Sequence, residues 1–420
     1  MYYEVIERGL NVKRFFAVLM MMALVSQGVF AGEIIFSDAK ALGVDVVSEN
    51  LDEQGKLTLN MNCSIDKVQF YDAETPKGDF TVLYTPQFYF GGAYGAPQLP
   101  VISKLIQIPA GADCRVVVKA YDSKVYNLAD FGISTPIYPR QPSAPKDGSE
   151  VPFVYEKSAY IFKGFNGQPI ATLEEIGTMR HMRLAHLTIA PVKYNPIENK
   201  IIVYNNIDFE VVLSKADIET TKKIHDDLWS PAFAWMESMV TIPESIRFAA
   251  RNGAQSYVIV TDPAFKDAIA PFAAWKTQKG FIVDVVSTEQ FGTGAAIIEG
   301  LKGYLHDLYN NPSPAKPAPS YVLFVGDHDN LPAFKGETGS HITDLYYAAV
   351  TPGDSLPDIL TGRFSAQNLD QLLPQIEKTV EYEKYQFPDP SFLDDVVLVA
   401  GWDASWAKSH GWPHINYAMK

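Results

Sequence analysis

A strand-like segment that ends in acidic residues and a histidine is the part of this 420-residue chain best suited to chemistry. Residues 321–332 read YVLFVGDHDNLP, so apolar and partly β-branched residues are followed abruptly by GDHD at 326–329. Buried parallel strands carry such continuous apolar runs, and α/β sheets bind their ligands at the carboxyl ends of strands. We therefore expect residues 326–329 to place polar groups at the ligand-binding edge of an α/β sheet.

Two further motifs lie downstream. Residues 341–347 read HITDLYY and residues 358–364 read DILTGRF. Together with residues 321–332, these motifs resemble the gingipain-like cysteine peptidases, a family of the caspase-like clan. The resemblance implies a cysteine-type endopeptidase precursor that acts on protein or peptide substrates. It also implies a pro-region that precedes the peptidase domain and binds it intramolecularly.

The second half of the chain has the alternating pattern of an α/β domain. Apolar segments predict strands at 257–261, 281–287, 321–325 and 395–400. Helical periodicity predicts helices at 262–279, 294–309 and 366–383. Alternating strands and helices favour a parallel sheet with flanking helices, which agrees with the caspase-like fold that the resemblance implies.

The first half has a different pattern, in which short alternating strands are separated by proline and glycine. Examples are KLTLNM at 56–61, RVVVKA at 115–120 and IIVYNNIDFEVVL at 201–213. Repeated short strands with such turns predict an all-β sandwich. The resemblance places the pro-region in this part of the chain.

These patterns predict a multidomain chain with four consecutive parts. They are a signal peptide at 1–31, a β-sandwich pro-region at 32–214, a linker or activation segment at 215–255, and the N-terminal part of an α/β peptidase domain at 256–420. Activation of a precursor requires an accessible cleavage position between pro-region and peptidase domain. Arg247 and Arg251 are the predicted processing sites in the linker.

Residues 1–31 have the features of an export signal. Lys13 and Arg14 precede an uninterrupted apolar run at 15–25, and VFA at 29–31 predicts cleavage after Ala31. This run is shorter than the roughly 20 residues that span a bilayer. We therefore expect a secreted, extracellular or cell-surface protein that has no membrane span once the signal is removed.

The composition excludes several classes of partner. Forty-nine acidic residues against 35 basic ones give a net charge of −14. Lysine and arginine do not cluster in the sequence, so nucleic acids and anionic membranes are poor partners. An apolar fraction of 47% is sufficient for packed cores.

The α/β part has histidines but no nucleophilic cysteine. His328 and His341 suggest general bases, yet residues 256–420 contain no cysteine. The resemblance places the histidine and cysteine of the catalytic dyad later in the domain, past Lys420. We therefore expect the 420-residue chain alone to be inactive. A hydrolase that uses a serine or a metal-bound water is a weaker alternative.

An acidic loop, GDSLPD at 353–358, offers the closely spaced oxygen atoms that Ca²⁺ requires. Gingipains bind calcium in a comparable loop. The resemblance therefore assigns a structural calcium ion to Asp354, the Leu356 carbonyl and Asp358, with Asp327 completing the site from the strand end. A solvated acidic turn is the alternative interpretation.

The resemblance also bears on substrate preference. Arginine-specific gingipains hold an acidic residue of the S1 pocket shortly after the strand that corresponds to 395–400. Residues 404–420 contain no Asp or Glu, and the matching position falls at His414 or its neighbour. An unpaired buried guanidinium is unfavourable. We assign His414 to the substrate cleft and expect no strict preference for arginine.

The two cysteines of the chain, Cys63 and Cys114, both lie in strand-like segments. An exported chain can oxidise such a pair, so a disulfide is one interpretation. Two buried thiols are the other, and the sequence does not decide between them.

Two functions from different classes are compatible with these features. The first is a secreted cysteine endopeptidase precursor, in which the catalytic dyad lies downstream of Lys420. The alternative is a non-catalytic exported binding or surface module with a caspase-like half-domain. A His-Gly motif and a later cysteine encoded beyond Lys420 would distinguish the first from the second.

Overall fold

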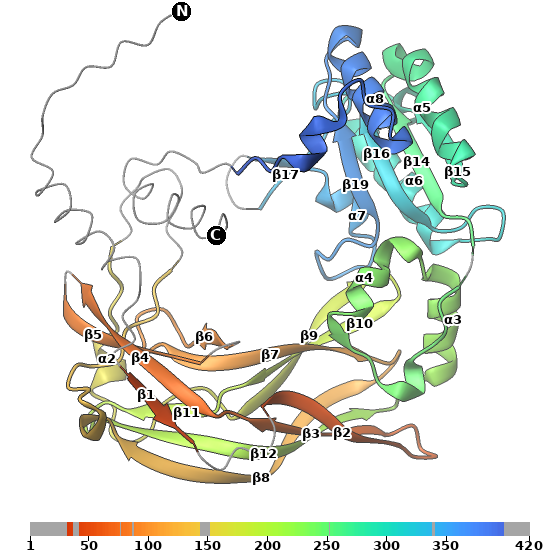
Figure 1. Ribbon diagram of the computed structural model, residues 1–420. Coiled ribbons are helices and arrows are strands. Elements are labelled where there is room, and N and C mark those ends of the chain that lie inside the picture. Colours follow the sequence, from red (N-terminus) through yellow and green to blue (C-terminus); the bar gives the residue numbers. More distant parts are fainter. Residues whose placement is uncertain are drawn as a thin grey trace, which may run out of the picture.

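The structure is a computed structural model, which describes residues 32–36, 42–75, 77–85, 88–142, 152–251, 253–337 and 341–398 (Figure 1). The signal segment with Ala31, and His414 near the other end, lie outside the described residues. Two folded units follow one another along the chain, a β-rich unit and an α/β unit. Among the described residues, the helices are all too short or too polar to cross a membrane.

The β-rich unit is built from three sheets. One five-stranded sheet contains β2 (Gly43–Leu51), β3 (Leu57–Ser64), β8 (Asp113–Asn127), β11 (Val192–Asn195) and β12 (Lys200–Ser214). The second contains β6 (Tyr89–Gly91), β7 (Leu99–Ile108), β9 (Ala171–Met179), β10 (Met182–Ile189) and β13 (Val240–Thr241). The third contains β1 (Gly32–Ile35), β4 (Lys67–Thr75) and β5 (Gly78–Tyr84). The short helices η1 (Leu128–Phe131) and α2 (Lys157–Tyr160) lie in the connections.

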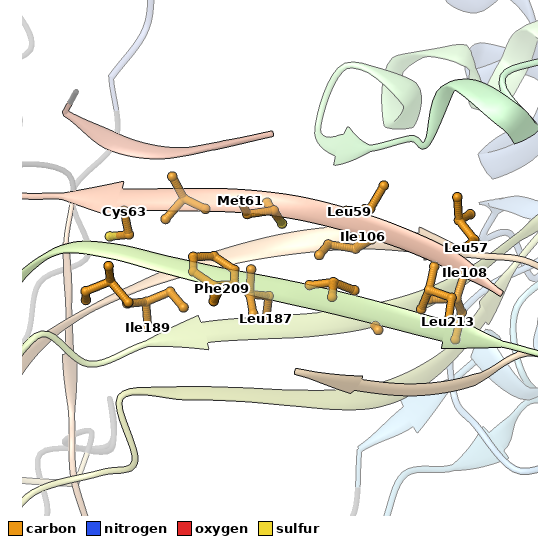
Figure 2. Packing of buried hydrophobic residues seen from close by; sticks show 14 of the residues in the cluster. Leu57, Leu59, Met61, Cys63, Ile106, Ile108, Leu187, Ile189, Phe209 and Leu213 are labelled. Atoms are coloured by element: carbon orange, nitrogen blue, oxygen red, sulfur yellow. The ribbon is translucent and has the colours of Figure 1, made fainter. Parts of the chain in front are cut away.

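The two five-stranded sheets pack face to face around one apolar core (Figure 2). Alternate residues of each strand point inward, because successive side chains of a strand face opposite sides. The core residues labelled in Figure 2 come from β3, β7, β10 and β12: Leu57, Leu59, Met61, Cys63, Ile106, Ile108, Leu187, Ile189, Phe209 and Leu213. The predicted all-β sandwich is confirmed.

The segment predicted as a linker, 215–255, is largely folded. It contains α3 (Ile218–Leu228), η2 (Pro231–Phe233), α4 (Ala234–Glu237), β13 and η3 (Glu244–Ile246). Strand β13 pairs in parallel with β7, which ties this segment to the sandwich. Residues 247–251 have no regular structure, so the extended connection is shorter than the sequence suggested.

The α/β unit is a four-stranded parallel sheet with the order β15-β14-β16-β19. Its strands are β14 (Ser256–Thr261), β15 (Ile282–Ser287), β16 (Pro319–Val325) and β19 (Leu360–Phe364). Its other elements are η4 (Pro263–Phe265), α5 (Lys266–Gln278), η5 (Thr288–Phe291), α6 (Ala295–Asn310), β17 (Phe334–Lys335), β18 (Ile342–Thr343), α7 (Leu345–Ala348), α8 (Leu369–Lys384) and η6 (Pro390–Asp394). The predicted fold, a sandwich followed by a parallel sheet with helices, is confirmed.

Both faces of this sheet are covered by helices (Figure 1). Val258 and Phe324 pack against α6 and α7 on one face, in a core with Leu301 and Leu305. The neighbouring residues of the same strands face α5 and α8 on the opposite side, in a second core. Burial on both faces explains why strands β14 and β16 are continuous apolar runs in the sequence.

The prediction of a strand at 395–400 is wrong for residues 395–398, which are the part of this segment that the structure describes. Residues 395–398 follow η6 without regular structure, and the side chains of Val396 and Val397 are 83% and 84% exposed. No described strand pairs with this segment. The sequence DVVLVA has the composition of a buried strand, but composition alone does not provide a neighbouring strand to pair with.

The disulfide interpretation is also wrong, since both cysteines are free thiols. Cys63 pairs with Ile207 of β12 and Cys114 pairs with Leu213, so the two lie on opposite sides of that strand and six residues apart along it. Six residues of strand correspond to about 20 Å. A disulfide requires Cα atoms within about 7 Å. Burial raises the pKa of the Cys63 thiol to about 12, which makes it unreactive.

Candidate functional site

The GDHD segment lies at the carboxyl edge of the parallel sheet, as its sequence predicted. Gly326 has a φ of +128°, and its N–H donates to the Phe364 carbonyl at the end of β19. Asp327 donates its N–H to the Ala366 carbonyl at 3.0 Å. The loop therefore follows the edge between β16 and β19, with His328 and Asp329 exposed.

The Asp327 carboxylate is held in its charged form. Burial opposes the charge, but hydrogen bonds from Gln367 and from the N–H groups of Asp329 and Asn330 outweigh it and hold the pKa of Asp327 below its usual range. His328 Nε2 lies 3.3 Å from Asp329 Oδ1 on the surface. Ligand atoms of Asp327, His328 and Asp329 all lie within 4.8 Å of one another.

Arg363 connects the three sequence motifs at this edge. Its Nε and Nη2 donate to the two carboxylate oxygens of Asp344 at 2.9 and 2.7 Å. Its Nη1 donates to the carbonyls of Gly326 and Leu331 at 2.7 and 3.0 Å. The motif at 358–364 thus holds both the motif at 341–347 and the loop at 326–329 in place. The sequence predicted the importance of these motifs but not the role of Arg363.

The four residues predicted to bind calcium do not lie together. Asp354, Leu356 and Asp358 precede β19, at the amino edge of the sheet, whereas Asp327 follows β16 at the carboxyl edge. Asp327 is level with residue 366, eight residues along the strand direction from Asp358, which corresponds to about 26 Å. Calcium ligands lie within about 2.6 Å of the ion. The predicted four-residue site is therefore wrong.

The acidic groups at the amino edge already have hydrogen-bond donors. Asp358 is fully buried, and its Oδ2 accepts from the N–H groups of Val350 and Thr351 at 2.9 and 2.8 Å. Burial raises the pKa of its carboxyl, although these N–H donors oppose the shift. Asp354 Oδ1 accepts from the N–H of Leu356 at 2.9 Å. The oxygens expected to bind metal instead organise the loop before β19.

Two of these acidic groups also bind the β-rich unit. Strands β9 and β10 form a hairpin that reaches from the sandwich toward the α/β unit (Figure 1), and residues 180 and 181 form its tip. The N–H of Arg180 donates to Asp358 Oδ1 at 2.8 Å. The N–H of Thr178 donates to Asp354 Oδ2 at 2.8 Å. The amino edge of the parallel sheet is therefore a contact between the two units.

Arg180 is itself buried, with an exposed fraction of 2%. Burial lowers the pKa of its guanidinium, while Tyr309 and Asp358 oppose the shift. The surrounding segment, TMRHMRL at 178–184, gives no sequence signal that this arginine is internal. The contact joins positions 178 residues apart, and local patterns do not report such pairs.

A cavity of about 390 Å³ lies beside this contact. It is lined by residues of both units, including Arg180, Ser230, Arg251, Gln255, Ser313 and Ser320. Ser230 Oγ and Ser320 Oγ are 2.8 Å apart, which forms a further hydrogen bond between the segment after α3 and strand β16.

The predicted processing sites lie in the connection between the units, and Arg251 lines this cavity. Both Arg247 and Arg251 are exposed. Arg247 donates to Glu244 Oε1 at 3.1 Å and to the Ile242 carbonyl at 2.9 Å, and Arg251 donates to the Asp226 carbonyl. The backbone around both is accessible to a peptidase.

Comparison with known proteins identifies both units. Residues 43–240 match Propeptide_C25, and residues 250–419 match Peptidase family C25. Lys-gingipain W83 of Porphyromonas gingivalis is 38% identical over 361 residues, which are 85% of this chain and 21% of that protein. Gingipain R2 of the same organism is 25% identical over 369 residues, 84% of this chain and 47% of that protein.

A solved structure described as showing the zymogenic latency of gingipain K from Porphyromonas gingivalis is 36% identical, with a TM-score of 0.40. The match covers 44% of this chain and 100% of that one. This chain spans about a fifth of the length of the Lys-gingipains that it matches. Since the two family matches include both folded units, the chain belongs to the gingipain-like cysteine peptidase precursors, with a C25 propeptide region followed by a C25 peptidase region.

Proposed function

We propose that the chain is the N-terminal part of a secreted endopeptidase zymogen whose catalytic cysteine is supplied by residues beyond Lys420. The observation that carries this proposal is the match of residues 250–419 to Peptidase family C25, a region without cysteine. The free thiols of Cys63 and Cys114 belong to the sandwich, and burial raises the pKa of both. Neither has the lowered pKa of a nucleophilic thiol.

In this proposal, the carboxyl edge of the parallel sheet contributes to the substrate cleft, and protein or peptide segments are the substrates. Cleavage of the connection at Arg247 or Arg251 separates the pro-region from the peptidase region. The exposed position of both arginines supports this step. Export through the signal at 1–31, with cleavage after Ala31, places the enzyme outside the cell.

The higher identity to Lys-gingipain (38%) than to gingipain R2 (25%) favours a preference for lysine at the cleavage position. The absence of Asp and Glu from residues 404–420 does not decide between the two, because a buried lysine ammonium needs an acidic partner as much as a guanidinium does. Calcium also remains a proposal. The charged Asp327, beside His328 and Asp329, supports it, whereas Asp354 and Asp358 do not fit the same ion.

Two histidines, His181 and His225, are buried close to Arg180 within the region that matches the C25 propeptide. The rings of His181 and His225 are 5.2 Å apart, and His181 Nε2 lies 3.8 Å from Glu237 Oε1. His181 Nδ1 is buried without a hydrogen-bond partner. Burial, together with His225 and Arg180, lowers the pKa of His181 to about 3. The pro-region contact therefore requires a neutral His181.

The first prediction concerns activity. The purified 420-residue chain should cleave no peptide in a thiol-dependent manner, because no cysteine lies in the C25 peptidase region. A fluorogenic peptide assay with and without a cysteine-directed inhibitor measures this, with the full-length protein as the positive control. Inhibitor-sensitive cleavage by the short chain would show that the catalytic thiol has been misplaced.

The second prediction concerns specificity. The full-length, processed enzyme should prefer lysine over arginine at the P1 position of a peptide library that varies only there. The measurement is kcat/KM for matched Lys and Arg substrates. Exclusive cleavage after arginine would refute the preference without affecting the assignment to the family.

The third prediction concerns calcium. Millimolar calcium should raise the Tm of the chain by a few degrees over a chelator, since a ligand that binds the folded state stabilises it. Asp327→Asn should reduce the increase, and the same concentration of magnesium serves as the control ion. A Tm that is the same in chelator and calcium would remove the metal from the proposal.

The fourth prediction concerns pH. In the unfolded chain, a histidine binds a proton below about pH 6.5, whereas folded His181 does so only near pH 3. The contribution of His181 to the unfolding free energy should therefore be complete above pH 6.5 and should be lost at about 1.4 kcal/mol per pH unit below it. Denaturant unfolding at pH 7, 6 and 5 measures this slope.

Substitution of His181 tests whether it causes the slope. His181→Leu should make the unfolding free energy depend less steeply on pH, and the remaining slope includes His225, whose pKa burial also lowers. Phe233→Leu, in the apolar cluster that contains the neighbouring Met182 and at a position without a titratable group, should lower stability equally at each pH. Parallel slopes for the wild type and His181→Leu would contradict the assignment.

A further inference from the structure

We propose that the tip of the β9–β10 hairpin is the anchor that keeps the pro-region bound to the peptidase region after the connection between them is cut, and that Arg180 is its principal binding residue. The inference deepens the proposed zymogen function and rests on it. It names the residues that hold the two parts together without a covalent link.

The side chain of Arg180 is bound by carbonyl oxygens from both units. Nη1 donates to the carbonyls of Pro319 and Asp358 at 2.5 and 3.2 Å, and Nη2 donates to the Ala318 carbonyl at 3.0 Å. All three belong to the peptidase region. Nε donates to the Leu228 carbonyl, at the end of α3, at 2.6 Å. The planar guanidinium thus bridges the amino edge of the parallel sheet and the pro-region.

Aromatic rings cover the guanidinium. Its carbon lies 5.2 Å from the ring centre of Tyr309, in the peptidase region, and 5.4 Å from that of Phe233, before the connection. Rings exclude water and attract the cation through their faces. The carbonyls of Pro319, Asp358 and Ala318 and the ring of Tyr309 form the socket for this side chain. The socket matches an arginine in shape, charge and hydrogen-bond geometry, whereas a lysine lacks the planar set of donors.

The backbone of Arg180 is bound as closely as its side chain. Its N–H donates to Asp358, and its carbonyl accepts from the Tyr309 hydroxyl at 3.1 Å. Arg180 adopts a φ of +60°, which is unfavourable for a residue with a side chain. Surrounding contacts must maintain such a conformation. Here those contacts come from the peptidase region.

A second part of the hairpin adds area to the contact. Gly177 packs so closely on Asp354 that a Cβ at this position would lie 2.6 Å from the carboxylate side chain. Leu356 and Leu360 of the peptidase region pack against the cluster that contains Met182 and Leu184 of β10. Apolar burial around a central arginine is the arrangement of binding hot spots.

The anchor does not depend on the residues that would be cut. Strand β13 and η3 remain attached to the pro-region, through pairing with β7 and burial of Val240, Ile242 and Ile246. The peptidase region resumes at β14. Cleavage between residues 247 and 251 therefore leaves the hairpin and its socket on separate but intact units.

The test uses the full 420-residue chain with a recognition sequence for a site-specific peptidase inserted between Ala249 and Ala250, both exposed. After cleavage, size-exclusion chromatography shows whether the fragments co-elute, and dilution gives their Kd. Wild-type fragments should remain together. Arg180→Met should raise the Kd by about 100-fold or more, which is typical for loss of a buried hot-spot residue.

Arg183→Met is the matched control. Arg183 lies on the same hairpin, but its bonds go to Glu175, Pro109 and Ala112 within the pro-region. This variant should change the Kd by less than about threefold. Circular dichroism of the uncut chains confirms folding. If Arg180→Met does not fold, Arg180→Lys replaces it, and about a tenfold increase in Kd is expected because the fork of donors is lost.

Two results would overturn the proposal. One is equal Kd values for the Arg180 and Arg183 variants, and the other is separation of the wild-type fragments as soon as they are cut. Association is measured without any peptidase assay. A failure of the anchor would therefore leave the cysteine peptidase proposal intact, and an inactive full-length enzyme would leave the anchor intact.

Discussion

A buried guanidinium remains charged, so Arg180 must find acceptors wherever the chain places it. The structure meets this requirement with carbonyls from strand β16, the loop before β19 and the end of α3. None of these groups is free to move far without leaving the charge unsolvated. This constraint is central to the relative position of the pro-region and the peptidase region, and the bonds Thr178–Asp354 and Ser230–Ser320 act in the same direction.

The two edges of the parallel sheet have different roles, and the length of the strands separates them. Its amino edge is occupied by the hairpin tip, with Asp354 and Asp358 bound to N–H groups of the pro-region. Its carboxyl edge carries the Arg363 network and Asp327, which lies about 26 Å from Asp358. Among the described residues, these hydrogen bonds from the hairpin lie at the edge opposite to the one where α/β enzymes bind their ligands.

Patterns with a short period predicted most of the fold. Apolar runs and helical periodicity located β14, β16, α5, α6 and α8 to within a few residues, since these elements bury continuous faces. The same reasoning failed at 395–400, where no described neighbour completes a strand. The resemblance grouped Asp327 with Asp358, although the two lie at opposite edges of the sheet. The burial of Arg180 could not be predicted from the sequence, since its hydrogen-bond partners are distant along the chain.

The connection between the units is short, because only residues 247–255 separate η3 from β14. A tether of this length holds the hairpin near its socket at an effective concentration in the millimolar range. In the uncut chain, even an anchor with micromolar affinity would stay closed almost all the time. The strength of the Arg180 contact therefore has little effect on the uncut chain, and it would determine the lifetime of the complex only once the connection were cut.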